Sequence, residues 1–410
     1  MKNFVLHFQA KKPQPLVYIR ALLQNYLFKD MVILGSLSIR QIVDNDLSII
    51  VLPGSRLLDP ANDEVEAPHD PRFAMAHQME IFRQRAAQSY LDIFRAFCQN
   101  RSRVRRTLCH SIQDWETVQA DAEEIDQLLQ VQLEEKPMVY QALGTGSDPA
   151  YSLPLSSWAY LYKLRLMEWI VQLGFELDIY HVDELAGMYW YLSYLAKTRA
   201  QHVERIKAFT VRCLEEHKAR PRGLSAAKEA QFTKSLSYLR LTMIDAAVVW
   251  ELADALSCLY TALQRLGLIV PPPRPYSTDA LRYDIRMKPF ASTGLPELPS
   301  FEAFTGATTQ PDVSTPSLLG YAERAVGGAK KGCEMLKKLN EKESFTVKSH
   351  ARWVSGTVNC QKSAIATGLA ISVVQRTLTN TPDGTPLKLR VDIKPPQERY
   401  HDWWTVPSVT

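Results

Sequence analysis

The chain has 410 residues, of which 46% are hydrophobic and 22% are charged, and this composition excludes a disordered chain. A net charge of +4 is too small to indicate nucleic-acid binding from total charge alone. The six cysteines include no Cys-x-x-Cys, so neither a disulfide framework nor a zinc site is predicted, and a reducing, cytoplasmic compartment is expected. The N-terminus lacks the apolar centre of a signal peptide, and the longest uncharged stretch near the middle, residues 185–196, is too short to cross a membrane.

Long helices are predicted along residues 1–267, which we expect to form a helical scaffold body. Apolar residues recur at helical spacing from Arg72 to about Arg106 and again from near Ser111 to Glu135, which predicts two helices that pair as a hairpin. The same spacing predicts three more helices. The first begins near Ser156. The second begins after an N-cap at Asp183 and ends at roughly His217. The third runs from Ser225 to Leu266, with Gly267 as the C′ residue.

Prolines are frequent in residues 268–315, which favours an extended strap across the helical body over packed structure. Residues 316–410 are the third predicted part, with C-terminal helices and a tail. One helix starts at the N-cap and N1 pair Thr315-Pro316, another covers residues 361–376, and the tail contains one short strand at most. The predicted fold is therefore all-α, with packed antiparallel long helices, a Pro-rich strap and at most a short β element near the C-terminus.

The residue spacings typical of metal, P-loop and hydrolase sites do not occur, so no catalytic, cofactor-binding or metal residue is predicted. One short match remains. Arg324, Gly327 and Ala329 fit the Arg/Gln-x-x-Gly-x-Gly/Ala pattern with which Gcn5-type acetyltransferases hold the pyrophosphate of acetyl-CoA. That chemistry needs a strand leading into a loop before a helix, whereas this match lies within or at the end of a predicted helix. We therefore favour a helix kink or cap, with acetyl-CoA binding as the alternative.

Arginines gather near the end of the first predicted helix, where five guanidiniums fall within about three helical turns. The next predicted helix is acidic, so an intramolecular salt-bridge network is one interpretation and contact with RNA or the ribosome is the other. The residues named for the possible ribosome or RNA contact are Arg101, Arg103, Arg105 and Arg106.

Large aromatic residues are in excess on the helix that begins near Ser156 and on the helix after Asp183. The first of these helices is apolar nearly all round, which indicates burial on several faces, either inside the fold or under a partner subunit. An obligate partner would explain the surplus, and ordinary core is the alternative. The residues named as a possible partner interface are Trp158, Trp169, Tyr189 and Trp190.

Two long stretches resemble a known family. They are FCQNRSRVRRTLCHSIQDWETVQADAEEID, residues 97–126, and SSWAYLYKLRLMEWIVQLGFELDIYHVDELAGMYWYLSYL, residues 156–195. Both look like the large auxiliary subunit of the N-terminal acetyltransferase C complex, NatC, particularly its fungal forms, and flanking segments fit from about Phe4 to Val391. Members of this family are larger, and their N-terminal half, with a Met-Asp-Pro-Lys-Met-Asp signature, has no counterpart here. The chain is thus similar to the C-terminal part alone.

The resemblance implies an auxiliary subunit that is not an enzyme. Proteins of this family clasp a Gcn5-type catalytic subunit and a small Sm-like subunit, and they help to place the complex at the ribosome. The assembled enzyme acetylates nascent chains that begin with Met followed by a bulky apolar residue. The resemblance carries over no catalytic residue, cofactor or membrane partner to this chain. A generic helical RNA- or ribosome-binding protein and a direct acetyl-CoA binder remain the alternatives.

Overall fold

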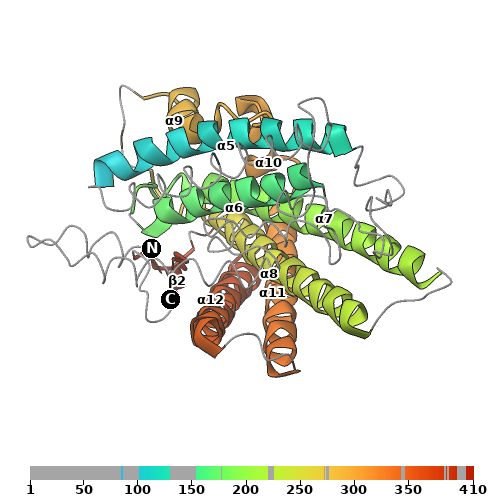
Figure 1. Cartoon of the computed structure of the whole chain (residues 1–410). Helices are drawn as coiled ribbons and strands as arrows, with labels where there is room; N and C mark the ends of the chain where they lie inside the picture. Colours follow the sequence, from blue (N-terminus) through green and yellow to red (C-terminus); the bar gives the residue numbers. More distant parts are fainter. Residues whose placement is uncertain are drawn as a thin grey trace, which may run out of the picture. The chain divides into compact units, whose positions relative to one another are not determined.

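The computed structural model describes Arg85 and residues 101–129, 154–176, 178–219, 226–271, 273, 277–342, 347–382, 385, 387–394 and 403–410. These residues are mostly helical, which confirms the predicted all-α class (Figure 1). The elements are α5 (Arg101–Leu129), α6 (Leu155–Glu176), α7 (Leu185–Lys218), α8 (Ala226–Arg265), α9 (Asp279–Met287), the 3-10 turn η2 (Lys288–Phe290), α10 (Phe301–Thr309), α11 (Thr315–Lys342), α12 (Val347–Asn380), β1 (Val391–Asp392) and β2 (Ser408–Val409).

The chain divides into two compact units that do not follow chain order. One unit contains residues 1–6, 166–198 and 244–410, and the other contains residues 7–165 and 199–243. Helices α6, α7 and α8 therefore contribute residues to both units. Composition suggested three consecutive parts. It does not show where a long helix passes from one unit to the other, because the residues on both sides of that point are of similar composition.

Helix α5 joins two segments that the apolar spacing separates. It runs without a break from Arg101 to Leu129, so the expected helix ends near Arg106 and Ser111 are wrong. The four residues between them include neither glycine nor proline, and nothing local stops the helix there. Apart from Arg85, the expected helix over residues 72–100 lies outside the described residues, as does its predicted pairing with α5.

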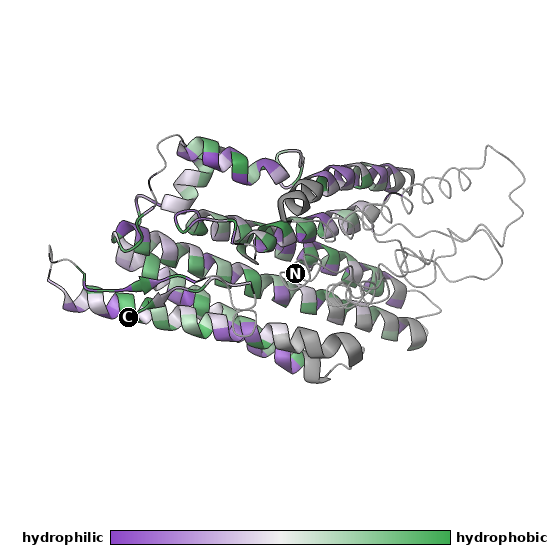
Figure 2. Cartoon of the chain, turned by 90° about the vertical axis from the view of Figure 1, so that its left-hand side faces the viewer, coloured by the Kyte–Doolittle hydropathy of each residue, from purple (hydrophilic) through white to green (hydrophobic). Residues whose placement is uncertain are grey.

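The helices bury hydrophobic residues, which alternate with hydrophilic ones along their length (Figure 2). Helix α6 is covered by this chain on nearly every side from Ser157 to Phe175. One described stretch, Ser235–Arg265 of α8, is long and apolar enough to cross a membrane by length and composition. However, 78% of its most apolar window is buried inside the protein, as in the core helix of a soluble fold.

Helix α8 ends as the sequence predicts, at a glycine. Gly267 has a φ of +68°, a backbone conformation that costs glycine little. Its N–H donates to the carbonyl of Gln264 at 3.0 Å, and the N–H of Leu268 donates to the carbonyl of Leu263 at 3.0 Å. These two bonds form a Schellman motif, which satisfies carbonyl groups at the helix end.

The Pro-rich strap, residues 268–315, is more ordered than its composition predicts, because it contains α9, η2 and α10. Each α-helix has a side-chain N-cap: Thr278 accepts from the N–H of Leu281 at 3.2 Å, and Ser300 accepts from the N–H of Ala303 at 3.2 Å. The expectation of a wholly extended strap is therefore wrong. The next helix, α11, begins where predicted, although the capping side chain is Ser314, one residue before the expected cap.

Helices α11 and α12 form an antiparallel pair within one unit (Figure 1). Lys337 contacts Gln361 toward one end, and Gln375 donates to the carboxylate of Glu323 at 3.3 Å toward the other. Helix α12 is much longer than the helix expected over residues 361–376. The residues just before that range are mostly serine, glycine, threonine and asparagine, which have weak helix propensity, but packing on α11 overrides it.

The C-terminal segment forms the short β element and then packs on aromatic residues of α7 and α8. Strand β1 pairs with β2 in antiparallel register. The ring of Trp404 stacks on Tyr189 of α7 with centroids 6.0 Å apart. The N–H of Thr405 donates to the hydroxyl oxygen of Tyr189 at 2.7 Å, and the hydroxyl of Tyr260 donates to the carbonyl of Thr405 at 3.0 Å. Two buried tyrosine hydroxyls thus form hydrogen bonds with the backbone N–H and carbonyl of Thr405.

Replacing Tyr189 by Phe should lower the free energy of unfolding by about 1–3 kcal/mol, because the buried N–H of Thr405 loses its acceptor. Tyr191→Phe is the matched control. Tyr191 is equally buried two residues away, and its hydroxyl has no hydrogen-bond partner among the described residues. Its removal should be neutral or stabilising. Urea unfolding followed by circular dichroism measures both, and equal effects of the two substitutions would contradict the assignment.

Candidate interaction surfaces

The four arginines predicted to contact RNA or the ribosome lie together in the first turns of α5. Arg101 and Arg105 are four residues apart and share one side of the helix. The acidic residues that were expected to neutralise these arginines lie further along the same helix, and two of them have other partners. Glu116 pairs with Lys163 at 2.8 Å, and Asp121 contacts Arg85. Contact of the arginines with RNA stays a prediction.

Three of the four aromatic residues named as a possible partner interface are buried by this chain. Trp158, Trp169 and Tyr189 are 2%, 7% and 0% exposed, respectively. Trp190 is partly exposed, and its ring meets Phe304 of α10 edge-on with centroids 5.5 Å apart. The chain itself covers most of the aromatic surface for which a partner was invoked, and the partner interface stays a prediction.

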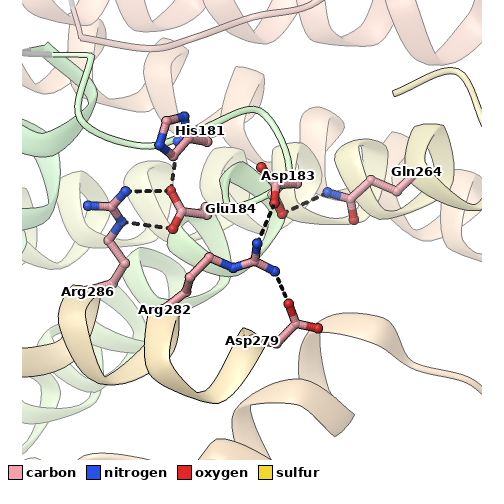
Figure 3. A network of polar contacts seen from close by, with 7 residues as sticks. All are labelled: His181, Asp183, Glu184, Gln264, Asp279, Arg282 and Arg286. Atoms are coloured by element: carbon pink, nitrogen blue, oxygen red, sulfur yellow. Dashed lines mark hydrogen bonds and ion pairs between the residues drawn. The ribbon is translucent and has the colours of Figure 1, made fainter. Parts of the chain in front are cut away.

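Helix α9 of the strap is fixed by two arginines to the loop before α7 (Figure 3). Arg286 donates from Nε and Nη2 to the two carboxylate oxygens of Glu184 at 2.9 and 2.8 Å, a bidentate pair. Arg282 places Nη1 3.8 Å from the carboxylate of Asp183, and Gln264 donates to the carbonyl of the same aspartate at 3.0 Å. The loop, α9 and the end of α8 are therefore joined at one point.

Burial of the Glu184 carboxyl raises its pKa, but hydrogen bonds outweigh this effect. The guanidinium of Arg286 and the backbone N–H of His181, which donates at 2.8 Å, both favour the ionised form. The pKa of Glu184 is therefore lower than its ordinary value. The carboxylate therefore stays charged at neutral pH, and its ion pair with Arg286 of α9 is kept.

The anchored helix presents apolar side chains to solvent. Leu281 and Ile285 lie one turn apart on α9 and are 47% and 50% exposed, whereas Tyr283 and Met287 are buried on the other side. Large exposed hydrophobic residues are concentrated in the strap, among the residues that the structure describes. These are Val270, Leu281, Ile285, Leu295 and Val313. The exposed apolar surface of the strap is therefore the candidate site for a protein partner.

The motif Arg324 to Ala329 lies in the interior of α11, which is continuous from Thr315 to Lys342. Its backbone amides are therefore inside a helix and not at a helix start, where they could meet a phosphate. A Cβ on Gly328 would lie 2.9 Å from the carboxyl carbon of Glu251 of α8. The glycine thus makes room for a carboxylate, which would repel a pyrophosphate.

A second glycine, Gly332, lies one turn after Gly328 and also faces α8. A Cβ on Gly332 would lie 2.4 Å from Cγ2 of Val248 of α8, whereas a Cβ on Gly327 would meet no atom within 4 Å. Gly328 and Gly332 therefore allow close contact between α8 and α11. Sequence reasoning took the motif as a kink or cap, and the structure shows instead a site of helix packing.

Long packed helices with buried aromatic residues, and a strap that presents apolar residues, define an all-α protein. The particular family is shown by sequence. The family model described as NAA35-like, TPR repeats matches residues 1–406, and the chain belongs to this family.

Two curated relatives are named as NatC auxiliary subunits. The chain is 23% identical over 320 residues to the Drosophila melanogaster protein named N-alpha-acetyltransferase 35, NatC auxiliary subunit homolog, which covers 74% of this chain and 39% of that protein. It is 24% identical over 189 residues to N-alpha-acetyltransferase 35, NatC auxiliary subunit, of Saccharomyces cerevisiae, covering 41% of this chain and 26% of that protein. The chain thus spans less than half the length of the relatives that it matches.

The fold is similar to that of a chain in a solved structure described as the apo NatC complex. The TM-score is 0.62 at 17% sequence identity, and the match covers 83% of this chain and 50% of that chain. A similar match, with a TM-score of 0.59, is found in the NatC complex bound to Gag peptide and CoA. At this identity the likeness establishes the fold.

Alanine at Gly332 and alanine at Gly327 should change stability in opposite directions. At Gly327 the new methyl group meets open space, and the free energy of unfolding should rise by roughly 0.5–1 kcal/mol, as for Gly-to-Ala in a helix. At Gly332 the methyl group collides with the stiff Val248 side chain, so this variant should be about 1–3 kcal/mol less stable than Gly327→Ala. Thermal and urea unfolding of both variants measures the difference, and equal stabilities would contradict close packing of α8 on α11.

Proposed function

We propose that this chain acts as a non-catalytic auxiliary subunit of a NatC-type N-terminal acetyltransferase complex in the cytoplasm. The observation that carries the proposal is the family match over residues 1–406. The solved chains of similar fold come from NatC complexes, and the curated relatives are named as auxiliary subunits. In this role the chain would serve acetylation of nascent chains that begin with Met and a hydrophobic residue, with the chemistry supplied by another subunit.

The proposed partners are a Gcn5-type catalytic subunit and a small Sm-like subunit. An apolar surface held rigid before binding favours affinity, because little conformational entropy is lost when the partner arrives. Helix α9 meets this requirement, since Arg282 and Arg286 fix it while Leu281 and Ile285 face solvent. We therefore assign binding of the catalytic subunit to the exposed apolar surface of the strap.

The alternatives receive less support. Direct binding of acetyl-CoA through Arg324 to Ala329 would need free amides at a helix start, but that segment lies inside α11 beside the carboxylate of Glu251. A generic RNA-binding role rests on the arginines of α5 alone. Ribosome association through these arginines is compatible with the auxiliary role and is proposed as part of it.

The chain should co-purify with separately prepared NatC catalytic and small subunits, and the complex should acetylate a Met-Leu peptide. Replacing Leu281 and Ile285 by Glu should weaken binding of the catalytic subunit roughly tenfold or more, because charges replace the apolar contact. Biolayer interferometry of the wild-type chain and the double variant measures the loss.

A double variant of α12 provides the matched control for that experiment. Ile365 and Leu369 are 46% and 64% exposed and also lie one turn apart, so their replacement by Glu makes the same charge change at similar exposure. This control should bind normally. If the α12 variant binds weakly and the strap variant binds as tightly as the wild-type chain, the assignment to the strap is contradicted. Absence of any binding by a chain that is folded by circular dichroism would contradict the proposed function.

Ribosome association should depend on the arginines at the start of α5 and weaken steeply with salt, since each phosphate contact releases counterions. Sedimentation with ribosomes at increasing salt measures this dependence. Gln at positions 101, 103, 105 and 106 should reduce association and flatten the salt slope. Gln at Arg240, an exposed arginine of α8 outside the cluster, is the control and should have little effect. An unchanged slope in the fourfold variant would remove α5 from the contact.

A further inference from the structure

Two cysteines far apart in sequence meet between α11 and α12. The thiol of Cys333 on α11 is hydrogen-bonded to Cys360 on α12. Neighbouring contacts fix the register of the two antiparallel helices. Lys337, one turn beyond Cys333, contacts Gln361, the residue after Cys360. Both cysteines therefore lie where α11 and α12 pack against each other.

The two thiols differ in access to solvent. Cys333 has no exposed surface, whereas Cys360 is partly exposed. Cys360 is therefore the more accessible residue of the pair, and Cys333 the enclosed one. Such an arrangement is that of an outer thiol, which reacts first with an oxidant, and an inner thiol, which resolves the product.

The surroundings of Cys333 favour its thiolate. The hydrogen bond with Cys360 lowers the pKa of Cys333, and the Lys337 ammonium acts in the same direction, whereas burial, Asp245 and Glu334 oppose them. The pKa of Cys333 is lower than its ordinary value as a result. In contrast, burial raises the pKa of Cys258 to about 12 and raises that of Cys213 as well. Cys333 is distinguished from these two buried cysteines by chemistry as well as by position.

We propose that Cys333 and Cys360 are a redox-sensitive pair, which a small disulfide oxidant such as oxidised glutathione converts to an intramolecular disulfide. The Cys360 thiol gives its proton to the Cys333 sulfur as it attacks one sulfur of oxidised glutathione, forms a mixed disulfide and releases one glutathione thiolate, which then takes the proton from Cys333. The Cys333 thiolate then attacks Sγ of Cys360 and releases the second. The two cysteine thiols are oxidised, the glutathione disulfide is reduced to two thiols, and the two protons pass to the departing glutathione sulfurs.

The bond would join α11 to α12 near the end of the pair that lies closest to the connection between the two helices. It would be absent in a reducing compartment and would form on oxidative stress. Because cross-linking restricts the unfolded chain more than the folded one, the oxidised form should unfold at a higher temperature than the reduced form. This inference goes beyond the proposed function, and neither depends on the other.

The test uses the full chain, reduced, freed of reductant and incubated with oxidised glutathione. The count of reactive thiols under denaturing conditions should fall by two from the six of the sequence. Proteolysis and mass spectrometry without reductant should find a peptide containing Cys333 joined to one containing Cys360. Reduction should restore all six thiols and return the unfolding temperature to its starting value.

Three variants separate the proposed steps. Cys333→Ser should stop at a mixed disulfide between Cys360 and glutathione, and Cys360→Ser should leave Cys333 reduced. Cys258→Ser replaces a buried cysteine outside the pair and should still form the cross-link. The proposal is overturned if the folded wild-type chain keeps a glutathione adduct on Cys360 without the cross-link, joins Cys333 to another cysteine, or loses no thiol.

Discussion

Burial of the aromatic groups of α6, α7 and α8 is the constraint on which the unit containing the strap and the C-terminal helices depends. These helices carry aromatic residues on more sides than one neighbour can cover, so the strap covers Trp190 and the tail covers Tyr189 and Phe175. Burial also raises the pKa of Tyr260, so its phenol stays neutral and can donate to the backbone of Thr405. Segments of weak intrinsic structure thus acquire their conformation from the core that they cover.

The strap shows how such a segment becomes a rigid surface. A nine-residue helix is too short to be stable alone in water. Helix α9 is held by a capping threonine and by arginines that reach two carboxylates before α7, and α10 places Phe304 against Gly187. The arginine contacts and the buried Tyr283 and Met287 hold α9 in place. Leu281 and Ile285 remain exposed. This separation of anchoring and exposed residues is what a partner-binding element requires.

The glycines of α11 illustrate why a short pattern is a weak guide to chemistry. In a phosphate-binding loop, glycine allows the backbone to approach a ligand; in α11, Gly328 and Gly332 allow α8 to approach the backbone instead. The short residue pattern is the same in both cases. The difference lies in the element that contains them, and the absence of a strand before the motif already favoured the structural explanation.

Features set by neighbouring residues could be predicted from the sequence, whereas those set by distant residues could not. The glycine stop of α8 depends only on residues between Leu263 and Leu268, and it was predicted correctly. The continuation of α5 and the early start of α12 depend on packing that overrides weak propensity. The covering of Tyr189 joins it to a tail 216 residues away, and no spacing rule reports such a contact. Aromatic size suggested a partner interface, and three of the four residues named for it, Trp158, Trp169 and Tyr189, are buried by the chain itself. The exposure of Leu281 and Ile285 likewise depends on how α9 packs, and the proline-rich composition of that segment did not predict it.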